Sequence, residues 1–180
     1  QTSGLISVAS GFHPLLLMPI GSDVLLEPFT TWRAKGLARF VLRRGDLVTV
    51  DADSMKRAVM AVSGLPSEKV TMIPWGVDVR YFSLDYDAEA CKRAMGWTDR
   101  KVVLKNRTHR PVYRHVDFLK AMARVATEVP QLLVVLLSDG PLTAELKALA
   151  SSLGIADRCL WPGHVDSETF RTMLRACDVY

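Results

Sequence analysis

The stretch QLLVVLLSDGPLTAELKALASSLG, residues 131–154, decides the fold class. It begins with an unbroken aliphatic run, Leu132–Leu137, and such a run is typical of a parallel strand that helices cover on both faces. The next four residues, 138–141, predict a tight turn. Leu142–Leu153 is then expected to form a helix that ends at Gly154. Strand, short turn and helix in this order are the repeating unit of a doubly wound α/β sheet.

The same alternation of short apolar runs and amphipathic segments extends on both sides of this stretch. Further strands are expected at Pro14–Ile20, Leu47–Val50, Val70–Ile73, Lys101–Lys105 and Cys159–Trp161. Further helices are expected at Thr31–Arg44, Ser54–Ser63, Ala88–Met95, His115–Thr127 and Ser167–Ala176, the last with Ser167 as its N-cap. Strands that alternate with helices predict parallel sheets.

A junction between two domains is predicted near residue 80. The segment Pro74–Asp87 contains a proline, a glycine and several aromatic residues, and it has little periodicity. We therefore expect two α/β domains, at residues 1–79 and 80–180. Because the chain opens on Gln1 and closes just as an apolar segment begins at Asp178, we also expect it to be an internal piece of a longer protein.

Composition narrows the class of protein. The 180 residues are 49% hydrophobic and carry a net charge of +4, with an isoelectric point near 9.1. This mild excess fits an anionic ligand or a membrane surface and is too weak to indicate nucleic acid. The three cysteines form no C-x-x-C pair, and the four histidines lack metal-ligand spacing, so we expect no disulfide framework, no metal site and a reducing, cytoplasmic location. No apolar run reaches the roughly 18 residues of a membrane span.

A basic loop follows the strand expected at Lys101–Lys105. Arg107, Arg110 and Arg114 fall within eight residues, directly before a predicted helix. Ligands of such sheets bind at the carboxyl ends of the strands, where a helix N-terminus and a guanidinium hold phosphate well. The alternative interpretation is a solvated basic loop.

Three other strand ends are candidate binding loops. Asp139 and Gly140 follow the central aliphatic strand, Gly163, His164 and Val165 follow the strand at Cys159–Trp161, and Gly21, Ser22 and Asp23 follow the first strand. Glycine at these positions lets backbone approach a flat ligand, and Asp23 is a candidate for orienting a sugar hydroxyl and a weak catalytic candidate. For each loop the alternative is an ordinary structural turn.

One helix is strongly basic. Between Thr31 and Gly45 there is no acidic residue, while Arg33, Lys35, Arg39, Arg43 and Arg44 are interleaved with Trp32 and Phe40. Such a helix, Arg33–Arg44, is able to dock on anionic lipid. The alternative is the solvated outer face of a packed helix.

Four motifs in one order resemble the glycosyltransferase 4 family. They are the loop at Gly21–Asp23, the sequence Gly76-Val77-Asp78 followed by Phe82, the sequence SDGP at residues 138–141, and the loop Gly163-His164-Val165 followed by "CDVY" at the end of the chain. The resemblance covers nearly the whole chain from about residue 14. It implies a GT-B fold, in which residues 1–79 are the C-terminal half of an acceptor domain and residues 80–180 the N-terminal half of a donor domain.

The resemblance also implies an activity and its residues. The family transfers a sugar from a nucleotide-diphosphate-sugar donor to a sugar, lipid or glycan acceptor, and most members retain the anomeric configuration without a metal or other cofactor. By position Arg107 matches the phosphate-binding arginine, with Arg114 or Lys105 as helpers. Gly163 and Val165 match the loop that meets the base, and Gly21–Asp23, Gly76 and Asp78 lie on the acceptor side. Ser138 stands where the family has a glycine, and the family's carboxylate motif would lie beyond Tyr180.

Two other functions are compatible with the same residues. One is a nucleotide-sugar epimerase or phosphorylase of the same fold. The other is a protein that binds nucleotide sugars without catalysis.

Overall fold

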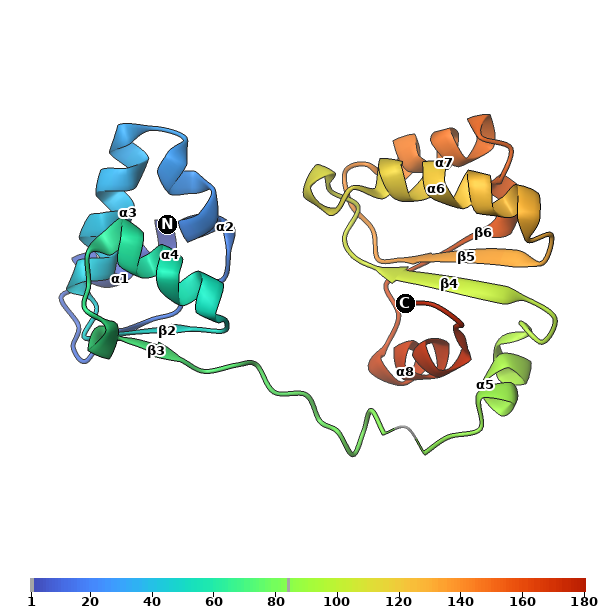
Figure 1. Ribbon diagram of the computed structural model, residues 1–180, viewed down its shortest axis with the longest axis horizontal. Coiled ribbons are helices and arrows are strands. Elements are labelled where there is room, and N and C mark those ends of the chain that lie inside the picture. Colours follow the sequence, from blue (N-terminus) through green and yellow to red (C-terminus); the bar gives the residue numbers. More distant parts are fainter. Residues whose placement is uncertain (1, 84) are drawn as a thin grey trace. The chain divides into compact units, whose positions relative to one another are not determined.

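The computed structural model describes residues 2–83 and 85–180 and contains two compact units, Gln1–Val77 and Asp78–Tyr180 (Figure 1). Each unit contains one three-stranded sheet, and all the strands are parallel. The alternation of strands and helices read from the sequence is therefore confirmed in both units.

The first unit has the strand order β1-β2-β3. Its strands are β1 Leu16–Leu17, β2 Leu47–Val50 and β3 Val70–Met72, and its helices are α1 Thr2–Ala9, α2 Ser22–Leu25, α3 Trp32–Arg44 and α4 Asp53–Ser63, with short 3₁₀ turns η1 Glu27–Phe29 and η2 Ser67–Lys69. One apolar core joins buried residues of the strands to Val41 of α3 and Val59 of α4. The predicted first strand is shortened to two residues, and helix α1 was not predicted.

The second unit has the strand order β4-β5-β6. Its strands are β4 Lys101–Asn106, β5 Leu132–Leu137 and β6 Cys159–Gly163, and its helices are α5 Ala88–Met95, α6 His115–Glu128, α7 Thr143–Ser152 and α8 Ser167–Ala176, with 3₁₀ turns η3 Pro111–Tyr113 and η4 Ala156–Arg158. Residue Lys101 pairs with Leu132 at one end of the first ladder, and Asn106 pairs with Leu137 at the other.

Helices cover both faces of the second sheet, as the aliphatic run predicted. Leu132, Val134 and Leu136 pack in a core with residues of α6 and α7, whereas Val135 and Leu137 pack in a separate core with Met173 of α8. Figure 1 shows α6 and α7 on one side of this sheet and α5 and α8 on the other. Alternate side chains of β5 point to opposite faces because the side-chain period of a strand is two.

Local signals set several helix ends. The Thr31 hydroxyl accepts a hydrogen bond from the Ala34 N–H at 3.1 Å and so caps α3. Gly64 and Gly96 end α4 and α5 in the left-handed conformation, which glycine adopts without a steric penalty. The predicted cap of α8 was wrong: the Asp166 carboxylate accepts the N–H bonds of Glu168 and Thr169, and Ser167 is the first helical residue.

Candidate functional site

The carboxyl end of β4 lies where the chain reverses its direction across the second sheet. The strands β5 and β6 lie on one side of β4, and Val179 pairs in parallel with Val103 on the other side. The loops that leave the ends of these neighbouring strands therefore diverge. In open α/β sheets a crevice forms at such a switch point and is the usual place for a ligand.

The predicted basic loop, residues 106–114, occupies this position. The Arg107 guanidinium is exposed and lies 5.5 Å from the ring centroid of Tyr113. The Lys105 Nζ lies 5.1 Å from the ring centroid of Phe118, and Arg114 forms an exposed ion pair with Asp117 at 2.6 Å. Within the described part of the chain, Arg107 and Lys105 make no ion pair, so their charges remain available to an anion.

Helix α6 begins directly after this loop and adds partial positive charge. Its N-cap is Arg114, which has a left-handed backbone (φ 52°) and makes no side-chain bond to the first turn. The N–H groups of that turn therefore lack the usual capping oxygen. An anion fits such an uncapped N-terminus because the N–H groups and the helix dipole both favour negative charge.

The loop after β6 meets the ends of β4 and β5 around a small cavity of about 140 Å³. Its lining residues are Asn106, Leu137, Ser138, Gly163, His164, Val165, Ser167 and Phe170. Three of the residues predicted to bind the nucleotide, Gly163, His164 and Val165, are thus together. Asn106, Ser138 and Phe170 join them. None of the three was predicted to bind the nucleotide, although Asn106 and Ser138 lie in the candidate segments at the ends of β4 and β5.

The turn after β5 is shaped by close backbone contacts. Ser138 has a left-handed backbone (φ 71°), is buried, and donates its N–H to the Gly163 carbonyl at 2.7 Å. Serine therefore adopts here the conformation that glycine adopts more easily. Asp139 lies beside Gly163, since a Cβ on Gly163 would lie 3.1 Å from Asp139 Oδ2.

Gly140 is required by the loop after β4. A Cβ on this residue would lie 2.7 Å from the carbonyl oxygen of His109 and 2.8 Å from its nitrogen. Both atoms are backbone, so a larger side chain displaces one loop or the other. Gly140 was predicted as a nucleotide-binding residue; the structure gives it a packing role between the two loops.

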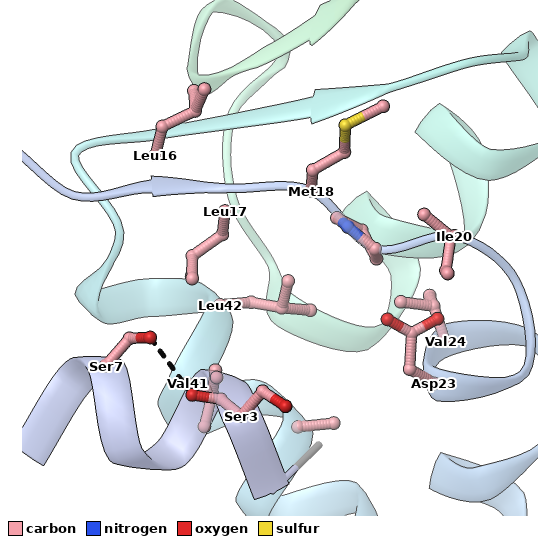
Figure 2. A pocket seen from close by; sticks show the side chains of 13 residues that line it. Ser3, Ser7, Leu16, Leu17, Met18, Ile20, Asp23, Val24, Val41 and Leu42 are labelled. Atoms are coloured by element: carbon pink, nitrogen blue, oxygen red, sulfur yellow. Dashed lines mark hydrogen bonds between the residues drawn. The ribbon is translucent and has the colours of Figure 1, made fainter.

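The first unit contains a larger cavity, of about 350 Å³, at the carboxyl end of β1. It is lined by Ser3, Gly4, Ser7, Leu16, Leu17, Met18, Pro19, Ile20, Asp23, Val24, Ala38, Val41 and Leu42. Figure 2 shows the Asp23 carboxylate beside Val24 and Ile20 at one end of this largely apolar wall. Gly21 (φ 147°) donates its N–H to Asp23 Oδ1 at 3.0 Å, and Ser22 is exposed. Among the described residues that line it there is no lysine, arginine or histidine, so an anionic diphosphate is better matched to the second unit.

Two predicted acceptor-side residues, Gly76 and Asp78, are not among the described residues that line either cavity. Gly76 is exposed and lies in a segment without helix or strand. The Asp78 carboxylate accepts the N–H bonds of Arg80 and Tyr81 at 2.9 and 3.0 Å and so stabilises a local turn. The structure thus gives Asp78 a local capping role.

Neither a metal centre nor a membrane span was found in the residues that the structure describes. Among residues 2–83 and 85–180, no group of three or more histidine, cysteine, aspartate or glutamate side chains is placed to hold a metal ion. Over the same ranges no helix has the length and apolar character needed to cross a bilayer.

Comparison with known proteins identifies the family. The family model described as "Glycosyl transferases group 1" matches residues 88–180, just over half of the 180 residues. The chain belongs to this family. The match spans α5 to α8 and so contains the switch point, the basic loop and the small cavity.

Two curated relatives resemble this group 1 chain. A GDP-mannose-dependent alpha-(1-6)-phosphatidylinositol monomannoside mannosyltransferase from Mycolicibacterium smegmatis is 27% identical over 154 residues, which are 83% of this chain and 40% of the relative. An N-acetyl-alpha-D-glucosaminyl L-malate synthase from Bacillus anthracis is 26% identical over 163 residues, 90% of this chain and 40% of the relative. The group 1 chain thus spans less than half the length of either relative.

Solved structures confirm the predicted fold. HepE of Anabaena, in complex with UDP and glucose, matches with a TM-score of 0.80 at 19% identity, over 98% of this chain and 49% of that one. Sucrose-phosphate synthase of Thermosynechococcus elongatus matches with a TM-score of 0.72 at 20% identity, over 98% of this chain and 46% of that one. The group 1 chain therefore has the Rossmann-like α/β units of GT-B glycosyltransferases.

Proposed function

We propose that the protein transfers a sugar from a nucleotide-diphosphate-sugar donor to a sugar, lipid or glycan acceptor, as a retaining, metal-independent enzyme of the glycosyltransferase 4 family. The observation that carries this proposal is the end of β4 with the loop 106–114 that follows it. There Lys105 of the strand and Arg107 of the loop, which pair with no described acidic residue, precede an uncapped helix N-terminus at the switch point. Membership of the group 1 family supports the reaction type.

The geometry explains how such a site promotes transfer. When the bond between the sugar and the diphosphate breaks, negative charge grows on the departing phosphate oxygens. Fixed positive charge at that place stabilises the transition state more than the bound donor, and this difference accelerates the reaction. Arg107 supplies a full charge and two N–H donors, Lys105 and Arg114 supply further charge, and the first turn of α6 supplies backbone N–H groups.

The relatives support a diphosphate donor without fixing its base. One relative is named for GDP-mannose, and the structural neighbour HepE was solved with UDP. The diphosphate is common to both nucleotides, so the proposal concerns that part of the donor. Gly163, His164, Val165 and Asp139 are the proposed contacts of the nucleoside, because three of them line the small cavity and Asp139 adjoins Gly163.

The first unit is the proposed acceptor side. Among the described residues that line its mostly apolar cavity, Asp23, Ser3 and Ser7 have polar side chains. Helix α3 adds a surface for peripheral membrane contact, since its five basic side chains are exposed and Trp32 is 79% exposed. The guanidinium groups of Arg33 and Arg44 stack on Trp32 and Phe40 at 5.2 and 4.8 Å.

The three cysteines are free, which supports a cytoplasmic location.

The test is calorimetric binding of UDP-glucose and of GDP-mannose to the chain and to Arg107→Ala. A charged hydrogen bond contributes roughly 1.5–3 kcal/mol, so we expect the variant to bind the accepted donor roughly 10- to 150-fold more weakly. Arg124→Ala is the matched control. Arg124 is an exposed arginine of helix α6, ten residues beyond the N-cap Arg114 and so about 15 Å along the helix axis from the proposed site. We expect it to bind like the wild type, and EDTA to leave both affinities unchanged. Equal binding by Arg107→Ala and Arg124→Ala would refute the proposed site.

A second measurement separates transfer from the alternative reactions. The full-length protein is incubated with a sugar-labelled donor, with and without an acceptor. Label that appears on the acceptor supports transfer. An epimerised nucleotide sugar formed without acceptor, or a donor that remains intact under all conditions, would instead favour one of the two alternatives.

A further inference from the structure

Two histidines are buried directly behind the basic loop. His109 is 0% exposed and His115 is 1% exposed, although histidine is usually at least partly accessible to solvent. Their ring centroids lie 5.0 Å apart in an edge-to-face arrangement, and the ring of Trp161 lies 5.6 Å from that of His109. Neither side chain contributes to the small cavity. Their place suggests that they act through the loop.

His109 attaches the basic loop to the turn between β5 and α7. Its N–H donates to the Asp139 carbonyl at 3.2 Å, and its carbonyl accepts the Leu142 N–H at 3.1 Å. The ring nitrogen Nδ1 lies 2.8 Å from the Thr143 hydroxyl, which is also bonded to Gly140. One residue therefore connects the loop to the turn through backbone and side chain together.

His115 attaches the same loop to helix α6. It is the first residue of that helix, and its Nε2–H donates to the Thr108 carbonyl at 3.1 Å. Thr108 follows Arg107 directly, and His109 follows Thr108. The backbone on the C-terminal side of Arg107 is therefore fixed at two consecutive residues, each by one of the histidines.

The surroundings favour the neutral form of both rings. His109 Nε2 and His115 Nδ1 are buried and make no well-aligned hydrogen bond with another described residue. Burial lowers the pKa of both imidazoles below the ordinary value of 6.5. The charge of His115 and of Lys147 on α7 also lowers the pKa of His109, while Asp139 and the Leu137 carbonyl raise it. The charge of Lys105 on β4 also lowers the pKa of His115, while the Thr108 and Arg107 carbonyls raise it.

We propose that His109 and His115 are positioning residues for donor binding: as a neutral pair they hold the loop 106–114 so that Arg107 meets the donor diphosphate. This inference rests on the proposed function. Because a released ring takes up a proton near pH 6.5 and the buried ring resists it, acid favours release of the loop. The positioning is complete above pH 6.5 and weakens as the pH falls below it.

The first test removes and then restores the bonds. In His109→Ala and His115→Ala we expect roughly tenfold weaker binding of UDP-glucose or GDP-mannose at pH 7.5, the effect of losing one buried hydrogen bond. His109→Asn keeps a polar group near Nδ1 and His115→Gln keeps an N–H near Nε2, so these variants should restore most of the affinity. His13→Gln is the control, since His13 is exposed in the first unit. Wild-type affinity in both alanine variants overturns the proposal.

The second test is the pH profile of donor affinity. The bridging diphosphate of a nucleotide sugar gains no proton between pH 7.5 and 5.5, so the ligand itself does not titrate. We expect wild type and His13→Gln to lose affinity as the pH falls through this range. The double variant His109→Asn/His115→Gln should lose far less, because its amide side chains take up no proton. Circular dichroism confirms that each variant is folded. A flat wild-type profile, or an unchanged slope in the double variant, overturns the proposal.

Hydrogen exchange separates this inference from the proposed function. If the wild type binds neither nucleotide sugar, the proposed function fails. The amides of residues 106–114 then still decide the role of the histidines, because release of the loop exposes them. Faster exchange of these amides in the alanine variants, and in the wild type at pH 5.5, supports positioning. Unchanged exchange refutes it.

Discussion

The two parallel sheets differ at their carboxyl ends. In the second unit the strand ends carry Arg107, Lys105 and an uncapped helix N-terminus around a small cavity. In the first unit the end of β1 opens on a cavity more than twice as large, whose wall is mostly apolar and has one carboxylate, Asp23. The same strand-turn-helix architecture thus presents positive charge in one unit and a mostly apolar wall with one carboxylate in the other. Fold alone does not tell which unit binds the donor; the side chains at the strand ends do.

The largest expected effect tests the close contact between two backbone loops in the second unit. In Gly140→Ala the new Cβ would press on the His109 backbone at 2.7–2.8 Å. We expect a loss of about 2–4 kcal/mol in the free energy of unfolding of the second unit, together with weaker donor binding. Urea unfolding followed by circular dichroism measures it. Gly36→Ala in α3 is the control, because nothing lies within 4 Å of its Cβ position, and it should be neutral or stabilising by about 1 kcal/mol. Equal stability of the two variants would contradict the packing argument.

The next prediction tests whether the positive charge of the first unit binds membranes and that of the second unit binds the donor. Changing Arg39, Arg43 and Arg44 to Glu removes exposed charge from α3. Each basic residue near an anionic bilayer contributes about 1 kcal/mol, so we expect more than tenfold weaker co-sedimentation with phosphatidylserine vesicles. Donor affinity should not change, because this helix belongs to the first unit. Phosphatidylcholine vesicles serve as the control surface. Unchanged sedimentation would remove the membrane contact from the proposal.

A smaller effect concerns the ion pair that attaches α5 to the second sheet. Lys92 Nζ lies 3.0 Å from both oxygens of Asp178, which also accepts the Val102 N–H at 2.8 Å. Burial opposes ionisation of Asp178, but the Val102 N–H and Lys92 outweigh it and lower its pKa below 3.8. The stabilisation is therefore present above pH 3.8 and is lost as the pH falls below it. Asp178→Asn should lower the free energy of unfolding by about 1 kcal/mol at pH 7 and very little near pH 3. Lys101→Ala should change it less, since Lys101 is 60% exposed and 3.7 Å from Asp178.

The smallest expected effect tests most directly whether the donor binds to the second unit and not to the first. Asp23→Asn keeps the oxygen that accepts the Gly21 N–H and removes the negative charge from the cavity of the first unit. We expect nucleotide-sugar affinity to stay within about twofold, because Asp23 is no part of the proposed donor site and salt screens charges that do not touch the ligand. Calorimetry under the conditions used for Arg107→Ala measures it. A change as large as that of Arg107→Ala would mean that the donor contacts the first unit.

Much of the fold could be read from the sequence because its causes are local. The run Leu132–Leu137 predicted a strand covered on both faces, and Gly64 and Gly96 marked helix ends, since each signal depends only on neighbouring residues. The position of Arg107 in a strand-to-helix loop was predicted for the same reason. Helix α1 was missed, and the cap of α8 was assigned to Ser167 in place of Asp166.

The tertiary structure alone decided how these local pieces meet. Pairing of Val179 with Val103 makes the end of β4 a switch point, and that pairing joins residues far apart in the chain. The burial of His109 and His115, and the contact that requires Gly140, arise because two loops pack together. No local pattern encodes these contacts, since each depends on which strands become neighbours. The sequence therefore determined the elements and the charged loop, and packing determined which residues surround it.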